Sequence, residues 1–375
     1  MSTNFGKKSW IVLLFFWYVV GHAQVSNTGI MDTVSGVKID KLSLSAYIDA
    51  YYGSASKKTS EKYIPYMVSS NRAGEFNINL AYIDLRYTDH NFRARFAPGV
   101  GTYMNTNYAA EQGTLKNVVE ASAGFKLSKT KEIWLDGGVI GSPYTNESAF
   151  SKDHLMYTRS LAPEYVPYYL SGIKLSIPLS RKFMFYAYLL NGWQQIQDVN
   201  NKKSLGTQVE YRPNDRNLFN WNTYIGDERS TISPTFRMRY FTDFYWIYNP
   251  DGKFSMTSCA YLGNQKTVLQ DRQKDNYWWQ ANLIGRYRFN QVWSLSGRFE
   301  YFNDPSNIQL VNLGDVTDKF KIWSAGLCLN VKVREGAMLR FEGRHFGSKD
   351  KIFPNEDGVN RNNNTWLVSN MTVWF

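Results

Sequence analysis

The sequence is poor in the residues that staple small folds and build many active sites. It has two cysteines, four histidines and 11 prolines in 375 residues. Two cysteines cannot form a disulfide framework. Cys259 and Cys328 lie on predicted strands that are three apart, about 14 Å at the usual strand spacing, so we expect them to remain unpaired.

Catalytic signatures are also missing from the sequence. Beyond the N-terminal segment the histidines are His90, His154 and His345, and none belongs to a Ser-His-Asp arrangement or an H-E-x-x-H pair. We therefore expect no enzyme activity, no cofactor and no metal site. The positive charge is spread along the chain instead of forming one patch, so nucleic acid is not an expected partner.

Long apolar runs are missing except at the N-terminus. Lys7 and Lys8 precede the apolar run 10–20, and the small residues of Gly21-His22-Ala23 follow it. This pattern predicts a secretory signal peptide over residues 1–23, because the run is well short of the roughly 20 apolar residues of a spanning helix. Residues 24–40 are expected to form a polar periplasmic lead-in without regular structure, and residues 41–375 a single domain.

Aromatic residues and alternation are abundant. Phe, Trp and Tyr make up 16% of the chain although its mean hydropathy is −0.42. Apolar and polar residues alternate with period two through nearly all of the chain after residue 41, and no apolar stripe with helical spacing stands out. The alternation slips between Leu80 and Ile83, which suggests a β-bulge. The chain is predicted to be almost entirely β, either a soluble β-protein or an outer-membrane barrel.

The connections between the predicted strands decide between these two classes, because short and long connections take turns. The short ones are 88–91, 128–131, 178–182, 212–217, 249–253, 290–291 and 334–336; the long ones are 53–75, 98–117, 142–167, 191–203, 226–234, 263–276, 303–319 and 346–364. Outer-membrane barrels have short periplasmic turns and long extracellular loops. The pattern therefore predicts a transmembrane antiparallel β-barrel of about 16 strands with both termini in the periplasm.

The C-terminus fits this prediction, because the chain ends within a strand, "WLVSNMTVWF". Met371, Val373 and Phe375 alternate toward lipid, and the terminal Phe375 resembles the signal that the barrel assembly machinery recognises. Outward aromatic residues are expected to form girdles at the membrane interfaces: Trp221, Tyr240, Trp279, Trp293 and Trp374. The expected location is the Gram-negative outer membrane, with its lipid and the barrel assembly machinery as partners.

Several stretches resemble the OmpL-like β-barrel porins of Bacteroidetes outer membranes. The most distinctive are "LLNGWQ" within 187–198 and "EYFND" within 298–306, and further similarity runs through 79–87, 93–108, 134–147, 168–177 and 243–256. "GRHFGS" (343–348) departs from the pattern. The resemblance implies an outer-membrane porin-like barrel, and it leaves the solute and the oligomeric state open.

Charged residues on the polar faces of the strands are the candidates for lining the pore. The basic candidates are Arg93, Arg95, Arg237, Arg239, Arg286, Arg288, Arg298, Arg340 and Arg344, and the acidic ones are Asp49, Glu120, Glu210, Asp243, Glu300 and Glu342. Arginines facing the lumen would favour anions mildly. The alternative is that many of them pair with neighbouring carboxylates and hold the wall together.

The long connection 142–167 is a further candidate, since it contains three prolines and could fold inward to narrow the lumen. Two functions therefore stay open. The first is passive diffusion of small hydrophilic solutes through an aqueous lumen. The second is a barrel plugged by its loops that acts as a surface binding or receptor protein.

Overall fold

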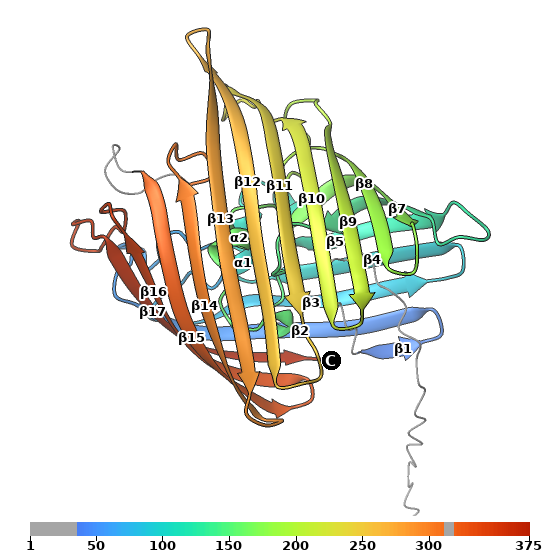
Figure 1. Ribbon diagram of the computed structural model, residues 1–375, viewed down its shortest axis with the longest axis horizontal. Helices are drawn as coiled ribbons and strands as arrows, with labels where there is room; N and C mark the ends of the chain where they lie inside the picture. The colour runs from blue at the N-terminus through green and yellow to red at the C-terminus, as the bar shows by residue number, and fades with distance from the viewer. Residues whose placement is uncertain (1–35, 311–318) are drawn as a thin grey trace, which may run out of the picture.

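The computed structural model describes residues 36–310 and 319–375. The predicted signal peptide, most of the lead-in and part of the predicted loop 303–319 lie outside the described residues. In the described chain sixteen strands, β2 to β17, form a closed antiparallel barrel (Figure 1). Each strand pairs with the next along the chain, and β17 pairs with β2 from Trp366 opposite Ala55 to Trp374 opposite Tyr47. The predicted barrel is confirmed.

The strands of the barrel vary from 8 to 17 residues in length. They are β2 (Leu42–Ala55), β3 (Phe76–Thr88), β4 (Phe92–Val100), β5 (Val118–Lys126), β6 (Trp134–Gly141), β7 (Tyr169–Pro178), β8 (Phe183–Leu190), β9 (Ser204–Asn214), β10 (Asn217–Asp227), β11 (Phe236–Tyr248), β12 (Phe254–Leu269), β13 (Arg272–Arg288), β14 (Trp293–Asp304), β15 (Phe320–Arg334), β16 (Ala337–Ser348) and β17 (Asn363–Trp374). A short strand, β1 (Val37–Ile39), pairs with the start of β2 and lies within the segment expected to lack regular structure.

Alternation places apolar side chains outside the barrel and polar ones inside. In β2, Ile48 is 51% exposed on the outer face while its neighbours Tyr47 and Asp49 are buried in the lumen. Closure of the barrel pairs the backbone N–H and C=O groups of every strand with those of its two neighbours, which hydrocarbon requires. No helix in the described parts of the chain is long and apolar enough to cross a membrane.

One predicted loop is wrong. The connection 263–276 was expected to be long, but β12 and β13 continue as a paired hairpin to a two-residue turn at Gln270 and Asp271 (the tallest hairpin in Figure 1). Both turn residues have positive φ, 49° and 59°, as in a type I′ turn. The pair Lys266 opposite Asp275 adds a favourable cross-strand charge. Gln-Asp lacks the Asn-Gly signal that marks such turns.

The predicted irregularity in β3 is present close to its expected place. The pairing register of β2 and β3 shifts between Asp49 and Ala50, which leaves Asn79 as the extra residue beside Leu80. The bulge turns the Asn79 side chain into the lumen. There Asn79 donates to Asp49 at 3.0 Å and accepts from the Ser70 N–H at 2.8 Å.

Outer aromatic residues follow the prediction with one exception. Trp221, Tyr240, Trp279 and Trp293 are exposed on the outer face. Trp374 is partly buried and packs against an inner aromatic cluster, because Val373 and Phe375 already occupy the outward positions of the last strand. The two cysteines, on β12 and β15, are buried and unpaired.

Two connections fold back toward the lumen. The segment between β6 and β7, residues 142–168, is called the inner loop below. It contains η2 (Ser151–Asp153), in which Ser151 is buried, and α2 (Leu161–Glu164), whose four residues are all buried. The segment between β4 and β5 contains α1 (Thr102–Asn107) and η1 (Gly113–Asn117). Figure 1 shows α1 and α2 behind the β12–β14 wall.

Candidate functional site

The inner loop is fastened to a wall carboxylate on β16. Glu342 accepts the backbone N–H groups of Tyr157 and Thr158, each at 2.9 Å, and also the Thr158 hydroxyl. The Arg298 guanidinium of β14 donates to the same carboxylate at 2.9 Å and to the Thr158 carbonyl at 2.6 Å. Glu342 therefore joins the loop backbone to the barrel wall through charge-assisted hydrogen bonds.

Two more wall carboxylates hold the loop in the same way. Asp243 of β11 accepts the Thr145 N–H at 2.6 Å, and Glu300 of β14 accepts the Leu161 N–H at 2.5 Å. These contacts lie at the two ends of the segment 145–161. The inner loop is thus attached to β11, β14 and β16. On β2, the Tyr47 hydroxyl also accepts the Ser151 N–H at 3.0 Å.

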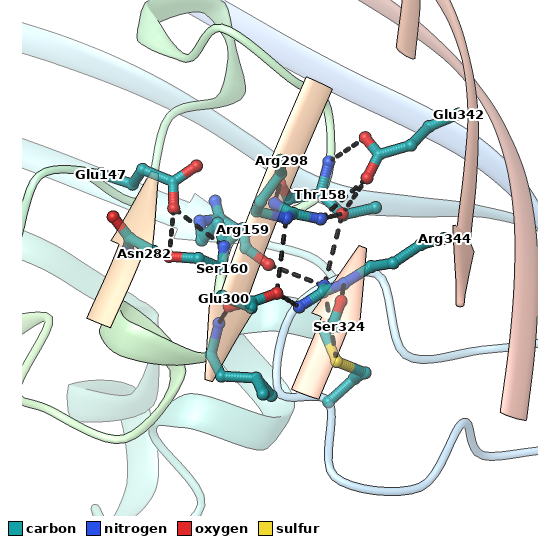
Figure 2. Close-up of polar contacts among 12 residues, drawn as sticks. Glu147, Thr158, Arg159, Ser160, Asn282, Arg298, Glu300, Ser324, Glu342 and Arg344 are labelled. Carbon is teal, nitrogen blue, oxygen red and sulfur yellow. Dashed lines mark hydrogen bonds and ion pairs between the residues drawn. The ribbon is translucent and has the colours of Figure 1, made fainter. Parts of the chain in front are cut away.

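Two of these carboxylates, Glu300 and Glu342, are paired with buried arginines (Figure 2). Arg298 lies 3.4 Å from Glu300, and Arg344 of β16 forms an ion pair with Glu300. Arg344 also donates to the Arg159 carbonyl of the loop at 2.8 Å. Buried ions of this kind are tolerated because each has an opposite charge and several hydrogen bonds.

Inside the loop, a buried glutamate and a buried histidine have shifted pKa values. Burial raises the pKa of Glu147, although it accepts the Ser160 N–H at 2.8 Å and lies near Arg298. Burial and the nearby guanidinium of Arg159 hold the pKa of His154 well below its usual value. Burial therefore disfavours the charged form of both groups in the seated loop.

A cavity of about 500 Å³ lies on the opposite side of the lumen, along β3–β9. Seven basic and four acidic side chains line it: Arg86, Arg93, Arg95, Lys174, Arg181, Lys182 and Arg212, with Glu120, Glu132, Asp136 and Glu210. We call these eleven residues the basic wall. Arg95 shows how they are ordered, since it contacts Asp84 at 2.9 Å and Glu120 at 2.7 Å. Such bridges fix each guanidinium in place while the wall keeps a positive excess.

A smaller cavity of about 60 Å³ extends from the basic wall to the inner loop. The two cavities share Arg95, Glu120 and Gly141 as lining residues. The smaller one is bounded on its other side by the inner loop, including Glu147. The smaller cavity therefore lies between the basic wall and the inner loop.

The predicted lining residues fall into four groups. The basic wall contains Arg93, Arg95, Glu120 and Glu210, and the inner loop is contacted by Asp243, Arg298, Glu300, Glu342 and Arg344. Near the end that carries the short turns lie Arg286, Arg288 and Arg340. Apart from these groups lie Arg237, Arg239 and Asp49. Arg237 donates to the Pro234 and Phe236 carbonyls, and Asp49 bonds to Asn79 and Asn370.

Sequence reasoning missed seven of the eleven residues of the basic wall. Arg86, Lys174 and Arg212 follow the same inward alternation as the residues that were singled out, and so does Asp136. The period-two pattern therefore contained this signal. Among the described residues there is no group of three or more His, Cys, Asp or Glu side chains placed to hold a metal ion.

Comparisons with known proteins agree with this geometry. The family model described as "Putative beta-barrel porin-2, OmpL-like" matches residues 41–375. The outer membrane channel DcaP of Acinetobacter baumannii is similar in structure, with a TM-score of 0.60 and 10% identity over 90% of this chain and 100% of that chain. No curated protein matches the chain.

Two further solved structures have comparable barrels. The anion-selective porin from Comamonas acidovorans has a TM-score of 0.56 and 10% identity over 89% of this chain and 99% of that chain. OmpT of Vibrio cholerae in its trimer form has a TM-score of 0.54 and 9% identity over 89% and 99% of the two chains. At these identities the similarity shows a shared fold.

Proposed function

The chain belongs to the OmpL-like beta-barrel porin-2 family and is an outer-membrane porin, and from this premise we propose that it conducts small hydrophilic solutes along its basic wall with a mild preference for anions. The observation that carries the proposal is the division of the lumen. The inner loop is fastened to β11, β14 and β16 and also to β2, and the larger cavity lies against β3–β9.

The charge on this path supports an anion preference of limited size. Seven basic and four acidic groups line the larger cavity, and buried Asp84 offsets part of the excess by bridging Arg86 and Arg95. A wall with a small positive excess raises the local concentration of anions without excluding cations. The late arginines contribute less to this path, because Arg298 and Arg344 are bound to the inner loop.

Reversal potentials across a salt gradient test the preference. A single channel of the refolded protein in a planar bilayer, bathed in unequal KCl, is expected to show stepwise openings and a chloride-leaning reversal potential. A potassium-leaning potential contradicts the proposed preference while leaving the channel itself intact. The anion-selective porin from Comamonas acidovorans shares the fold, and its selectivity is a property of that protein.

A second candidate, a plugged barrel with a binding surface outside, has its own supporting observation. The inner loop is bonded to the extracellular segment 56–75, where Glu164 accepts the Val68 and Ser69 N–H groups at 2.6 and 2.9 Å. Tyr66 of that segment in turn donates to the Ile352 carbonyl of a third loop. These contacts cover part of the mouth. A folded protein that stays silent in the bilayer would favour this candidate.

The remaining expectations follow from the same premise. The fold and the family are those of a channel rather than of an enzyme. We propose that residues 1–23 are removed as a signal peptide, and that Phe375 directs recognition by the barrel assembly machinery. A similar fold is known in a trimer form, and we propose a homo-oligomer here as well; cross-linking of the detergent-extracted protein tests it.

A further inference from the structure

Arg286 and Arg288 of β13 share the same weak, neutral hydrogen-bond acceptors. Both guanidinium groups donate to the Asn249 amide oxygen, at 3.4 and 3.3 Å, and both lie 3.4 Å from the Ser255 hydroxyl. Ser255 itself donates to the same Asn249 oxygen at 3.1 Å. One neutral oxygen therefore receives three donors. Arg288 also donates weakly to the Pro250 and Asp251 carbonyls, at 3.3 and 3.5 Å, and neither arginine forms an ion pair in the described part of the chain.

A third arginine approaches the pair from across the sheet. Paired Cα positions run from Arg288 through Ser294 and Asn330 to Arg340 on β16, so these residues lie in one row of the barrel wall. The Arg340 Nε donates to the Asn330 side chain at 3.2 Å, so the guanidinium lies on the β15 side of β16, the side that faces β13 along this row. Arg286 lies within electrostatic reach of both Arg288 and Arg340.

Arg340 is the least satisfied of the three. Its side chain is fully buried, and among the described residues neither of its terminal nitrogens has a hydrogen-bond partner. Burying a charge without a partner lowers the free energy of unfolding by roughly several kcal/mol. The carboxylates near Arg340 are engaged elsewhere, because Glu342 holds the inner loop and Asp49 bonds to Asn79 and Asn370.

We propose that Arg286, Arg288 and Arg340 form a binding site for a multiply charged oxyanion of the phosphate type. Guanidinium forks match the oxygen spacing of such anions, and three positive charges on one patch favour an anion that carries more than one negative charge. The site lies beside the short turn 249–253, hence at the periplasmic end of the lumen. It is distinct from the basic wall, which occupies β3–β9.

The proposal deepens the proposed function, because it places an oxyanion site on the lumen of an anion-preferring channel. Free phosphate, sulfate and phosphomonoesters share the required chemistry. Calorimetric titration of the detergent-solubilised full-length protein with inorganic phosphate, then with sulfate and glycerol phosphate, distinguishes them. Chloride at matched ionic strength is the reference for non-specific screening.

The decisive variant removes the two partly exposed charges. Arg286→Gln/Arg288→Gln is expected to weaken phosphate binding by about tenfold or more, as loss of charge-assisted hydrogen bonds predicts. Arg237→Gln is the matched control, because Arg237 bonds to carbonyls of its own turn. Arg286→Lys/Arg288→Lys keeps the charge without the forked geometry and should give an intermediate affinity. If the double variant does not fold, Arg288→Gln alone carries the test.

Two results would overturn the site: wild-type protein that takes up no phosphate, or Arg286→Gln/Arg288→Gln protein that binds it as tightly as wild type. The reversal potential reports separately on the channel. A potassium-leaning potential together with arginine-dependent phosphate binding contradicts the anion preference and supports the site. A chloride-leaning potential without phosphate binding supports the anion preference and contradicts the site.

Discussion

Removing the Glu342 carboxylate should release the inner loop from the wall. In Glu342→Ala, the Tyr157 and Thr158 N–H groups, the Thr158 hydroxyl and the Arg298 guanidinium all lose their shared acceptor. Breaking a buried ion pair from one side costs about 3–5 kcal/mol. A shift of that size changes the ratio of seated to released loop by about a hundredfold or more. The barrel persists, because its backbone ladder does not involve Glu342's side chain.

Single-channel recording and limited proteolysis measure the release. Glu342→Ala channels should show greater current noise and altered conductance, and the inner loop should be cut at a protease concentration that spares wild type. Glu342→Gln keeps an acceptor oxygen and should lie between the two. Glu335→Ala is the control, since that carboxylate is exposed in a short turn and pairs with Lys332. Folded Glu342→Ala protein with wild-type currents and a wild-type digestion pattern would refute the anchoring role.

Three further predictions concern the outer wall, the basic wall and the buried histidine. Leu327→Arg, at the middle of the outer face of β15, should lower the free energy of unfolding in lipid vesicles by about 2–4 kcal/mol. Val333→Arg, near the rim, should lower it by about 1 kcal/mol or less. Equal losses for the two variants would contradict the membrane placement. Asp84→Asn should move the reversal potential further toward chloride, because it removes a buried negative charge from beside Arg86 and Arg95. A shift toward potassium would oppose the proposed path. The pKa of His154 is held below its ordinary value of 6.5, so its contribution to loop seating is complete above that pH and is lost as the pH falls. The protease sensitivity of the loop should therefore rise with acidification in wild type and rise less in His154→Gln. Equal pH profiles would show that His154 does not cause the effect.

Much of the barrel could be predicted because it depends on a local rule. Each strand must show one face to lipid and one to water, so alternation marks the strands and Ile48 and Asp49 reveal their own orientation. The length of the connections then gives the sidedness. The extended hairpin of β12 and β13 was not predicted because its turn, Gln270-Asp271, lacks the Asn-Gly or Asp-Gly pair typical of positive φ. A polar hairpin that extends beyond the membrane looks like a loop in the sequence.

The site could be predicted only in part, because its organisation depends on long-range contacts. Alternation shows that Arg95 and Arg298 both face the lumen, but it does not show that one lines a cavity and the other is covered by the inner loop. That difference arises from contacts such as Glu342 with Thr158, which are 184 residues apart in the chain. The prolines of 142–167 permitted an inward fold, and the wall carboxylates determine to which side it attaches.

Charged thiol reagents applied to engineered cysteines test the central claim, that the path runs along β3–β9 and not behind the inner loop. The two native cysteines are buried and unpaired, and would first be replaced by alanine. Ser122→Cys lies in the larger cavity, and Ser324→Cys lies on the fully buried β15 surface beside Arg344. A charged methanethiosulfonate should reduce the current through Ser122→Cys channels and leave Ser324→Cys channels unchanged. Block at Ser324→Cys with no effect at Ser122→Cys would contradict the account.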